Sequence, residues 1–281
     1  TVARTLAQGL TPRLGQQVIV ENREGAGGAV GFRAGATAAP DGYTILMVVH
    51  PPFAASPYLQ KNPAYDPIKD FTPIARVSTT PLILIANNDA PFKTFAEMAA
   101  FARQNPGKLN YASSGIGTAS HLYMEQIKLA LGLNISFIPY KSTGQQMMDT
   151  ISGQVQLSLP SLIGGLPQVS GGKVRLLAIG ASARNPSLPD IPTFAEVINQ
   201  ADFDGGVWYG FVFPRGTPVA MVSRINAEMA TALESPSVSK VIASSGAERA
   251  HTSPARFAEL IELGAANAQR IIRELKIEPQ N

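Results

Sequence analysis

Short apolar runs alternate with helical segments along this chain, and that alternation limits its fold more than any other feature. Strands that alternate with helices are typical of α/β domains, in which helices flank a mainly parallel sheet. We therefore predict an α/β fold built on parallel sheets. The expected strands cover residues 17–22, 43–49, 82–86, 109–112, 136–140, 155–159, 174–180 and 208–213.

The ends of several expected helices carry clear signals. Thr94-x-x-Glu97 is a capping box, which opens a helix, and Ser253-Pro254 combines an N-cap residue with proline at the first helical position. Residues 218–234 carry one apolar stripe, which indicates a helix packed on a core. Prolines crowd residues 51–73, where we expect irregular chain with short helical turns.

Composition and charge exclude several classes of protein. The 281 residues suit two domains better than one small core. Lysine and arginine number 23 against 20 acidic residues, a net charge of +3, and they form no stripe of the kind that nucleic acids require. The absence of cysteine excludes disulfides, thiolate nucleophiles and cysteine-based metal sites. No apolar stretch approaches the roughly 20 residues that cross a bilayer.

The chain opens on a helical pattern, with Val2, Leu6 and Leu10 four residues apart. An α/β domain usually opens on a strand. We therefore expect that an N-terminal piece, with a signal peptide before it, is missing from this sequence.

Two segments have the order strand, glycine-rich loop, helix, which binds anions because loop N–H groups and the positive end of the helix dipole face one point. The first, residues 25–31, has Val30 where a dinucleotide fingerprint has its third glycine, so a close-packed turn is the simpler interpretation. The second, from Ser113 to His121, adds hydroxyls to the glycines. It is either an anion site or a serine-rich turn before an N-cap. Its candidate ligand contacts are Ser113, Ser114, Gly115, Gly117 and Thr118.

Catalytic and metal sites find little support in the sequence. His50, His121 and His251 stand in unrelated contexts, and there is no nucleophile elbow. His50 ends an apolar strand, where α/β sheets place ligand loops, and is a candidate ligand contact. Trp208, at the start of a strand, either lines a binding cleft or packs in the core. We expect no metal site, no cofactor and no catalytic residue.

Short motifs follow one another in a specific order along the whole chain. They are Val20-Glu21-Asn22-Arg23, Pro40-Asp41-Gly42-Tyr43-Thr44, Asp70-Phe71-Thr72-Pro73-Ile74-Ala75, the run from Asn105 to Gly115, Pro139-Tyr140-Lys141, Gly153-Gln154-Val155, the runs Arg175 to Ala178 and Leu188 to Glu196, and Trp208-Tyr209-Gly210. Each motif alone is weak, but their order and spacing are specific. On these motifs the chain resembles the Bug-type solute-binding proteins of tripartite tricarboxylate transporters.

The resemblance implies a periplasmic binding protein-like fold, in which two α/β lobes are joined by crossing strands with a ligand cleft between them. We place lobe one at residues 1–86 plus 206–281 and lobe two at residues 87–205. It also implies that loops of both lobes hold a small carboxylate through amides, hydroxyls and bridging waters.

The resemblance carries over to particular residues. It assigns the loop from Ser113 to Thr118 to lobe two, with Ser161 reaching in from the same lobe. It sets the His50-Pro51 loop and the Ser78-Thr79-Thr80 turn opposite them, which makes Ser78 a further candidate contact. The chain departs from the family pattern in two places. The family begins with a strand and a ligand-binding loop before the first helix, and we expect that this N-terminal strand and loop are missing here. Ser142 stands where the family usually has glycine.

We expect a monomeric periplasmic solute-binding protein that captures a dicarboxylate, an aromatic acid or a similar carboxylate and delivers it to membrane transporter subunits. A sensory module with a signalling partner would bind the same ligands and stays open as an alternative. An enzyme that pairs His121 with Ser114 is disfavoured, because no carboxylate is spaced to orient His121.

Overall fold

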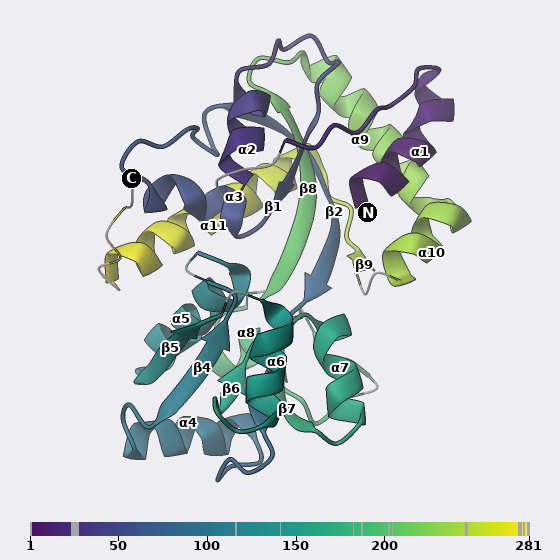
Figure 1. Ribbon diagram of the computed structural model, residues 1–281. Coiled ribbons are helices and arrows are strands. Elements are labelled where there is room, and N and C mark those ends of the chain that lie inside the picture. Colours follow the sequence, from purple (N-terminus) through teal and green to yellow (C-terminus); the bar gives the residue numbers. More distant parts are fainter. Residues whose placement is uncertain are drawn as a thin grey trace. The chain divides into compact units, whose positions relative to one another are not determined.

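The computed structural model describes residues 2–23, 28–115, 117–140, 142–181, 183–186, 188–201, 203, 205–244, 247–274, 277 and 279. The chain divides into two compact units (Figure 1). Unit 1 comprises Thr1–Thr79 with Trp208–Asn281, and unit 2 comprises Thr80–Val207. The chain passes between them within β2 (Phe71–Pro81) and β8 (Gly206–Pro214).

Unit 1 is built on a four-stranded sheet in the order β1 (Leu46–Val49), β8, β2, β9 (Glu248–Arg249). β1 runs antiparallel to β8, with Leu46 opposite Val212, and β2 runs antiparallel to β9. The expectation of parallel sheets is therefore wrong for these pairs. These pairs join segments far apart in the chain, so the local alternation of strands and helices did not reveal their direction.

Helices cover both faces of this sheet (Figure 1). One hydrophobic cluster joins the sheet to α1 (Val2–Leu14), α9 (Val219–Glu234) and α10 (Pro236–Ser244). Another joins it to α2 (Ala29–Ala36), α3 (Pro52–Ala55) and α11 (Pro254–Glu274), and a short 3-10 turn, η2 (Ser56–Leu59), follows α3. Strand β8 serves both clusters because its side chains alternate between the two faces: Trp208 and Val212 enter the second cluster, and Phe211 and Phe213 enter the first.

Unit 2 is built on a five-stranded sheet in the order β5 (Ile135–Pro139), β4 (Leu109–Ser113), β6 (Leu157–Ser158), β3 (Ile83–Asn87), β7 (Val174–Ile179). β4 is parallel to both β5 and β6, while β3 is antiparallel to β6 and β7. Because of these pairings β3 belongs to unit 2, although the sequence analysis placed residues up to 86 in lobe one.

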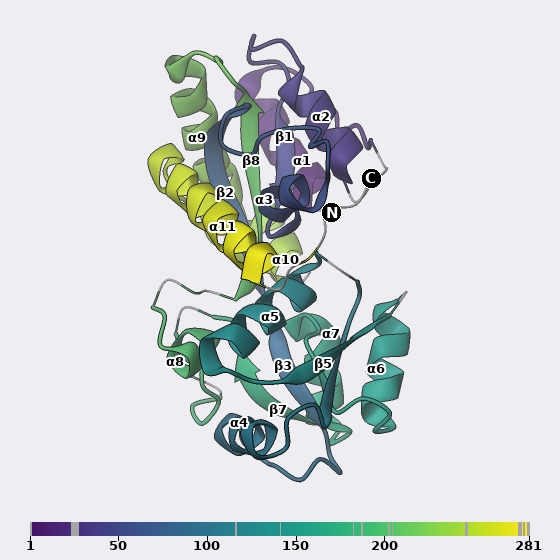
Figure 2. The ribbon, with the colours of Figure 1, turned by 90° about the vertical axis from the view of Figure 1, so that its left-hand side faces the viewer.

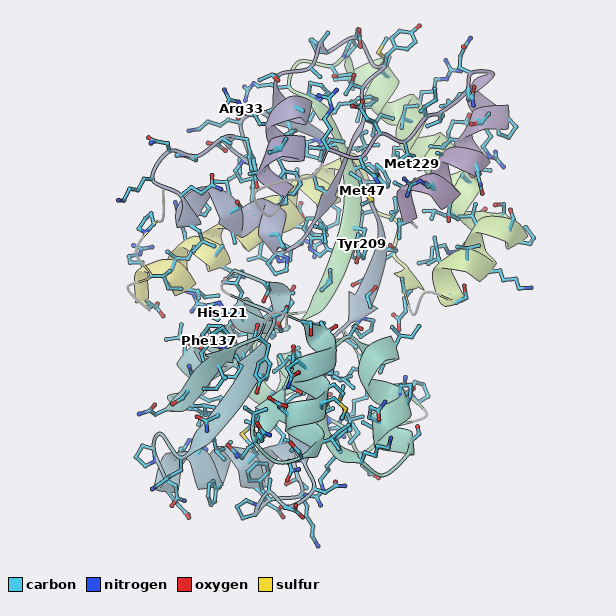
Figure 3. The ribbon with its side chains drawn as sticks, viewed as in Figure 1. Arg33, Met47, His121, Phe137, Tyr209 and Met229 are labelled. Carbon is cyan, nitrogen blue, oxygen red and sulfur yellow. The ribbon has the colours of Figure 1, made fainter. Side chains whose placement is uncertain are left out.

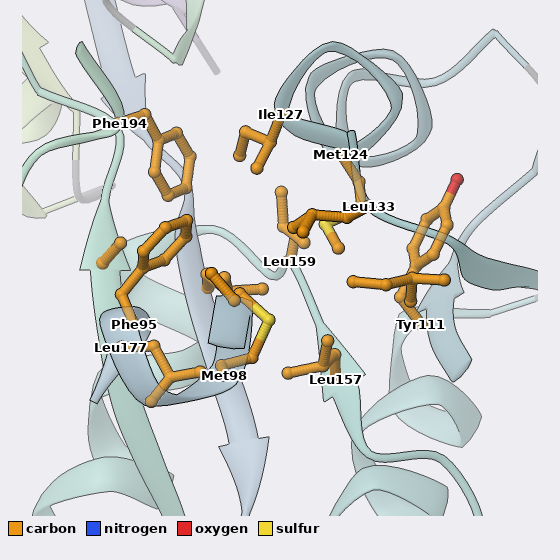
Figure 4. Packing of buried hydrophobic residues seen from close by; sticks show 14 of the residues in the cluster. Phe95, Met98, Tyr111, Met124, Ile127, Leu133, Leu157, Leu159, Leu177 and Phe194 are labelled. Atoms are coloured by element: carbon orange, nitrogen blue, oxygen red, sulfur yellow. The ribbon is translucent and has the colours of Figure 1, made fainter. Parts of the chain in front are cut away.

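The core of unit 2 lies on both faces of its sheet. Figure 2 shows α4 (Phe95–Gln104), α5 (Ala119–Leu131) and α8 (Phe194–Ile198) on one side and α6 (Thr143–Ile151) and α7 (Leu162–Ser170) on the other. The larger cluster packs Phe95 and Met98 of α4 against Met124 and Ile127 of α5 and Phe194 of α8 (Figure 4). The expected capping box at Thr94 is confirmed, since Thr94 Oγ1 accepts the Glu97 N–H and Glu97 accepts the Thr94 N–H.

Several expected elements differ from the structure. Residues 17–22 form no strand, and Ile19 is 78% exposed; a β-branched run needs a neighbouring strand to pair with. Ser78-Thr79-Thr80 lies inside β2 and is not a turn. Helix α7 was not expected. In the first glycine-rich loop, residues 25–27 lie outside the described residues, and Gly28 precedes α2 with φ 100°.

Candidate ligand-binding site

The three parallel strands of unit 2 end at the same edge of the sheet. Each is followed by a helix, and the N-cap residues are Thr118 for α5, Ser142 for α6 and Ser161 for α7. Helix N-termini present unpaired N–H groups and the positive end of the helix dipole, so they favour anions. We call this edge, with its three N-termini, the carboxyl edge. An edge of this kind is suited to bind a carboxylate.

The loop between β4 and α5 is tied together by hydroxyl groups. Ser113 is fully buried, and its Oγ lies 2.7 Å from Ser120 Oγ and 3.0 Å from Thr118 Oγ1. The Thr118 hydroxyl donates to Gly115 O at 2.7 Å. Thr118 therefore holds the N-cap position that the sequence predicted, but its side chain closes the loop instead of capping the helix.

The same loop leaves backbone donors available. Gly115 and Gly117 have φ of 127° and 78°, the left-handed region that glycine adopts without steric cost. Within the described residues, the Ser114 and Gly115 N–H groups donate to no protein acceptor, and neither do those of the first turn of α5, at 119–121. A bound anion can accept hydrogen bonds from these amides.

His121 lies in the first turn of α5 against the inside of this loop. Its Nδ1 accepts the Gly117 N–H at 3.4 Å, and its ring contacts Phe137 at a centroid distance of 4.6 Å (Figure 3). Burial lowers the pKa of His121; the charge of Glu125 raises it in part, and that of Lys128 lowers it further. The neutral ring, with its proton on Nε2, fits these contacts.

Glu125 was missed in the sequence analysis, although it stands four residues after His121, a spacing that places two residues on one helix face. Its carboxylate is buried and accepts the Tyr111 hydroxyl at 2.5 Å and Lys128 Nζ at 2.6 Å. The statement that no carboxylate is spaced to orient His121 is thus wrong. In the described residues, however, no hydrogen bond joins Ser114 to His121, so the two do not form a nucleophile–base pair.

The other loops of the carboxyl edge adjoin the first. Tyr140 N donates to Ser113 O at 2.8 Å, which links the ends of β5 and β4. Ser161 is half-buried, pairs as an isolated bridge with Leu82, and its carbonyl accepts the N–H groups of residues 164 and 165. The structure thus brings Ser161 and the Ser113–Thr118 loop to one edge.

His50 and Trp208 meet in unit 1. Their rings stack at 4.7 Å with an interplanar angle of 8°, and His50 N donates to Trp208 O at 3.0 Å. Trp208 is 2% exposed and packs edge-on against Phe257. Burial lowers the pKa of His50 to about 3. The structure shows both rings within the core packing of unit 1; their role as ligand contacts stays a prediction.

Ser78 lies in β2 opposite Arg249 of β9 and is fully buried. Its Oγ has no hydrogen-bond partner within the described residues. A buried hydroxyl without a partner is costly unless something else accepts or donates. Its role as a ligand contact also stays a prediction.

Other kinds of site are not found in the described part of the chain. It holds no group of three or more side chains that could bind a metal ion. None of its helices combines the length and the apolar character that crossing a membrane requires.

Comparison with known proteins places these features in a family. The TctC family model, described as the tripartite tricarboxylate transporter family receptor, matches residues 2–277. The structure of the periplasmic binding protein BugD is similar, with 35% identity, a TM-score of 0.74, and coverage of 99% of this chain and 93% of that one. Two structures from Rhodopseudomonas palustris are also similar: Rpa4515 with adipate (29% identity, TM-score 0.77, covering 99% and 93%) and MatC with bound malate (31%, 0.71, 96% and 93%).

The family model spans nearly the whole chain, and the similar structures cover both units. The two-unit α/β architecture and the resemblance seen in the sequence are thereby confirmed. The chain belongs to the tripartite tricarboxylate transporter receptor family, whose members, the Bug proteins among them, are periplasmic solute-binding proteins and not enzymes.

Proposed function

We propose that this protein captures a small dicarboxylate and delivers it to the membrane subunits of a tripartite tricarboxylate transporter. The observation that carries the proposal is the carboxyl edge of unit 2, where the β4–α5 loop presents unpaired amides at the start of a 13-residue helix. Adipate and malate, the ligands of two similar proteins, are both dicarboxylates. Delivery to membrane subunits follows from the family.

The charges at the carboxyl edge favour a carboxylate held by neutral donors. The described residues of the β4–α5 loop include no lysine or arginine. Lys128 is paired with Glu125, and burial keeps His121 neutral. Amide dipoles aligned at a helix start stabilise an anion without a full counter-charge.

The structure gives less support to an amino acid or an aromatic acid. An ammonium group needs a carboxylate partner, but Glu125 accepts from Tyr111 and Lys128, and Asp149 accepts from Tyr140 and Gln145. An aromatic acid needs an apolar slot. Of Trp208, Tyr209 and Phe53, which could line one, Trp208 and Phe53 are 2% and 0% exposed and Tyr209 is half-buried.

A thermal-shift and calorimetry screen tests the proposal. Malate, adipate and succinate are compared with aspartate, benzoate and acetate. A ligand at about a hundred times its Kd should stabilise the protein by roughly 2.7 kcal/mol, and it should be recovered chemically unchanged. Binding of aspartate or benzoate in preference to every dicarboxylate would overturn the ligand class.

A matched pair of glycine variants tests the location. Gly115→Ala and Gly107→Ala both place alanine at positive φ with no atom closer than 4.0 Å to the new Cβ. Gly107→Ala reports the general cost of alanine at positive φ, with φ of 76° against 127° at Gly115, and only Gly115 lies in the β4–α5 loop. We expect Gly115→Ala to raise the Kd about tenfold or more, since one lost hydrogen bond to a charged group costs roughly 1.5–3 kcal/mol. Equal effects of the two variants would argue against this loop.

A further inference from the structure

We infer that His121 is a positioning residue of the carboxylate site. Its unprotonated Nδ1 accepts the Gly117 N–H and so holds the β4–α5 loop in the shape that presents its free amides. This inference rests on the proposed function for its effect on ligand binding. It goes beyond that function because it names a residue that acts through the loop instead of touching the ligand.

The geometry fixes both partners of this contact. Gly117 has φ 78°, and its N–H points back to His121 Nδ1 at 3.4 Å. The ring is 4% exposed and lies against Phe137 at 4.6 Å, so it has little freedom to turn away. Other loop contacts come from the hydroxyls of Ser113, Thr118 and Ser120 and from the Thr118 N–H, which donates to Gly115 O. The His121–Gly117 hydrogen bond is one tie between the second half of the loop and α5, and the Thr118–Ser120 hydroxyl contact is another.

The tie depends on the protonation state of His121. A neutral imidazole accepts at the nitrogen that carries no proton, whereas an imidazolium donates from both nitrogens. Protonation of Nδ1 therefore sets two N–H groups against each other, and the Gly117 contact is lost. The loop amides should then be less well ordered, and dicarboxylate binding should weaken.

The groups around His121 keep it neutral. Glu125 and Lys128 face it from α5, Phe137 packs on it from β5, and Tyr111 of β4 donates to Glu125. By itself, the negative charge of Glu125 would raise the pKa of the His121 ring. Burial lowers the pKa of His121 below its usual value, and the charge of Lys128, which pairs with Glu125, lowers it further. Tyr111, Glu125 and Lys128 thus form a hydrogen-bonded group next to His121.

Two replacements of His121 separate the loss of its hydrogen-bond acceptor from the loss of its ring. In His121→Asn, Oδ1 takes the place of Nδ1 and can accept the Gly117 N–H; in His121→Leu, no acceptor remains. With malate and adipate as probes at pH 7.5, we expect His121→Leu to raise the Kd roughly three- to tenfold, the worth of about one hydrogen bond. His121→Asn should bind nearly as wild type does. If His121→Leu binds like wild type, or if His121→Asn is as weak as His121→Leu while both melt like wild type, the inference is wrong.

The pH dependence of the dicarboxylate Kd distinguishes this role of His121 from a purely structural one. The Kd of each protein is divided by the Kd of His121→Asn at the same pH. This ratio cancels the effect that protonation of the ligand has on binding. This ratio should rise as the pH falls through the pKa of His121, which burial holds below the usual value for histidine. Glu125→Gln removes the group that raises the His121 pKa, so the rise should begin at lower pH; Lys128→Met should make it begin at higher pH.

Lys108→Met is the control, because Lys108 is exposed and outside this network, and it should leave the profile unchanged. A ratio that falls with falling pH would mean that His121 acts as a positive charge on the ligand, and would overturn the inference.

Nitrogen-15 NMR of the His121 ring in the ligand-free protein distinguishes failure of this inference from failure of the proposed function. We expect Nδ1 to be unprotonated at neutral pH and the Gly117 amide signal to move in step with the His121 titration. If this is seen while no dicarboxylate binds, the proposed function fails and the loop contact stands. If Nδ1 carries the proton, the inference fails whatever the protein binds.

Discussion

Buried His50 makes the stability of the fold of unit 1 depend on pH. Burial between Trp208 and helix α11 lowers its pKa from 6.5 to about 3. The unfolded chain therefore takes up a proton on this side chain at a higher pH than the folded protein does. The stability that the neutral ring contributes is complete above about pH 6.5 and is lost as the pH falls toward 3.

His50→Asn should make stability less sensitive to acid. One proton taken up only by the unfolded state changes the free energy of unfolding by about 1.4 kcal/mol per pH unit. Between pH 6 and pH 4 the free energy of unfolding of the variant should therefore fall less steeply than that of the wild type, by up to this amount. Urea denaturation at a series of pH values measures it. The other titrating groups are the same in both proteins, so parallel curves for variant and wild type would contradict the prediction.

Two glycines in helices, Gly264 and Gly144, allow the effect of core packing on stability to be separated from the effect of helix propensity. Gly264 in α11 lies so close to His50 that an added Cβ would be 2.4 Å from His50 Cε1. Gly144 in α6 is exposed, and an added Cβ there meets no atom within 4 Å. Alanine favours the helical backbone equally in both places, but only at Gly264 does it collide with the core.

We therefore expect opposite signs for the two substitutions. Gly264→Ala should destabilise the protein by about 1–3 kcal/mol through overpacking, and Gly144→Ala should stabilise it by about 0.4–1 kcal/mol. Denaturant unfolding of both variants under one condition measures the difference. A stabilising Gly264→Ala would show that the His50 ring moves aside at little cost.

At the scale of the whole molecule, each unit has its own core. The clusters of unit 2 draw their members from residues 82–207, and those of unit 1 from residues outside that range. Unit 2 is also one continuous segment, whereas unit 1 consists of two. A continuous segment with a complete core meets the usual condition for folding alone.

We predict that residues 80–207 expressed alone fold into a stable domain. The fragment should show a far-ultraviolet spectrum of mixed helix and strand and a cooperative thermal transition. The same fragment with Leu84→Asp, which places a charge at a fully buried position, should show no such transition. A wild-type fragment that melts without cooperativity would mean that unit 2 depends on unit 1 for its fold.

The sequence by itself determined the features that arise from neighbours in the chain. The capping box at Thr94, the start of α11 at Pro254 and the helical stripe of α9 depend on contacts within a few residues, so local patterns predicted them. The order of short motifs was enough to identify the family. The loop from Ser113 to Thr118 was predicted to bind an anion from its residue types, since glycines and hydroxyls before a helix favour such a site, and that role stays a prediction.

Only the tertiary structure decided which distant segments meet. Residues 17–22 have strand-forming side chains but no partner strand, β1 and β2 pair antiparallel with β8 and β9, and Trp208 is buried because α11, far along the chain, covers it. Likewise the Glu125 carboxylate meets the Tyr111 hydroxyl only because α5 packs on β4. Strand pairing and burial depend on contacts between residues remote in sequence, and no local pattern records them.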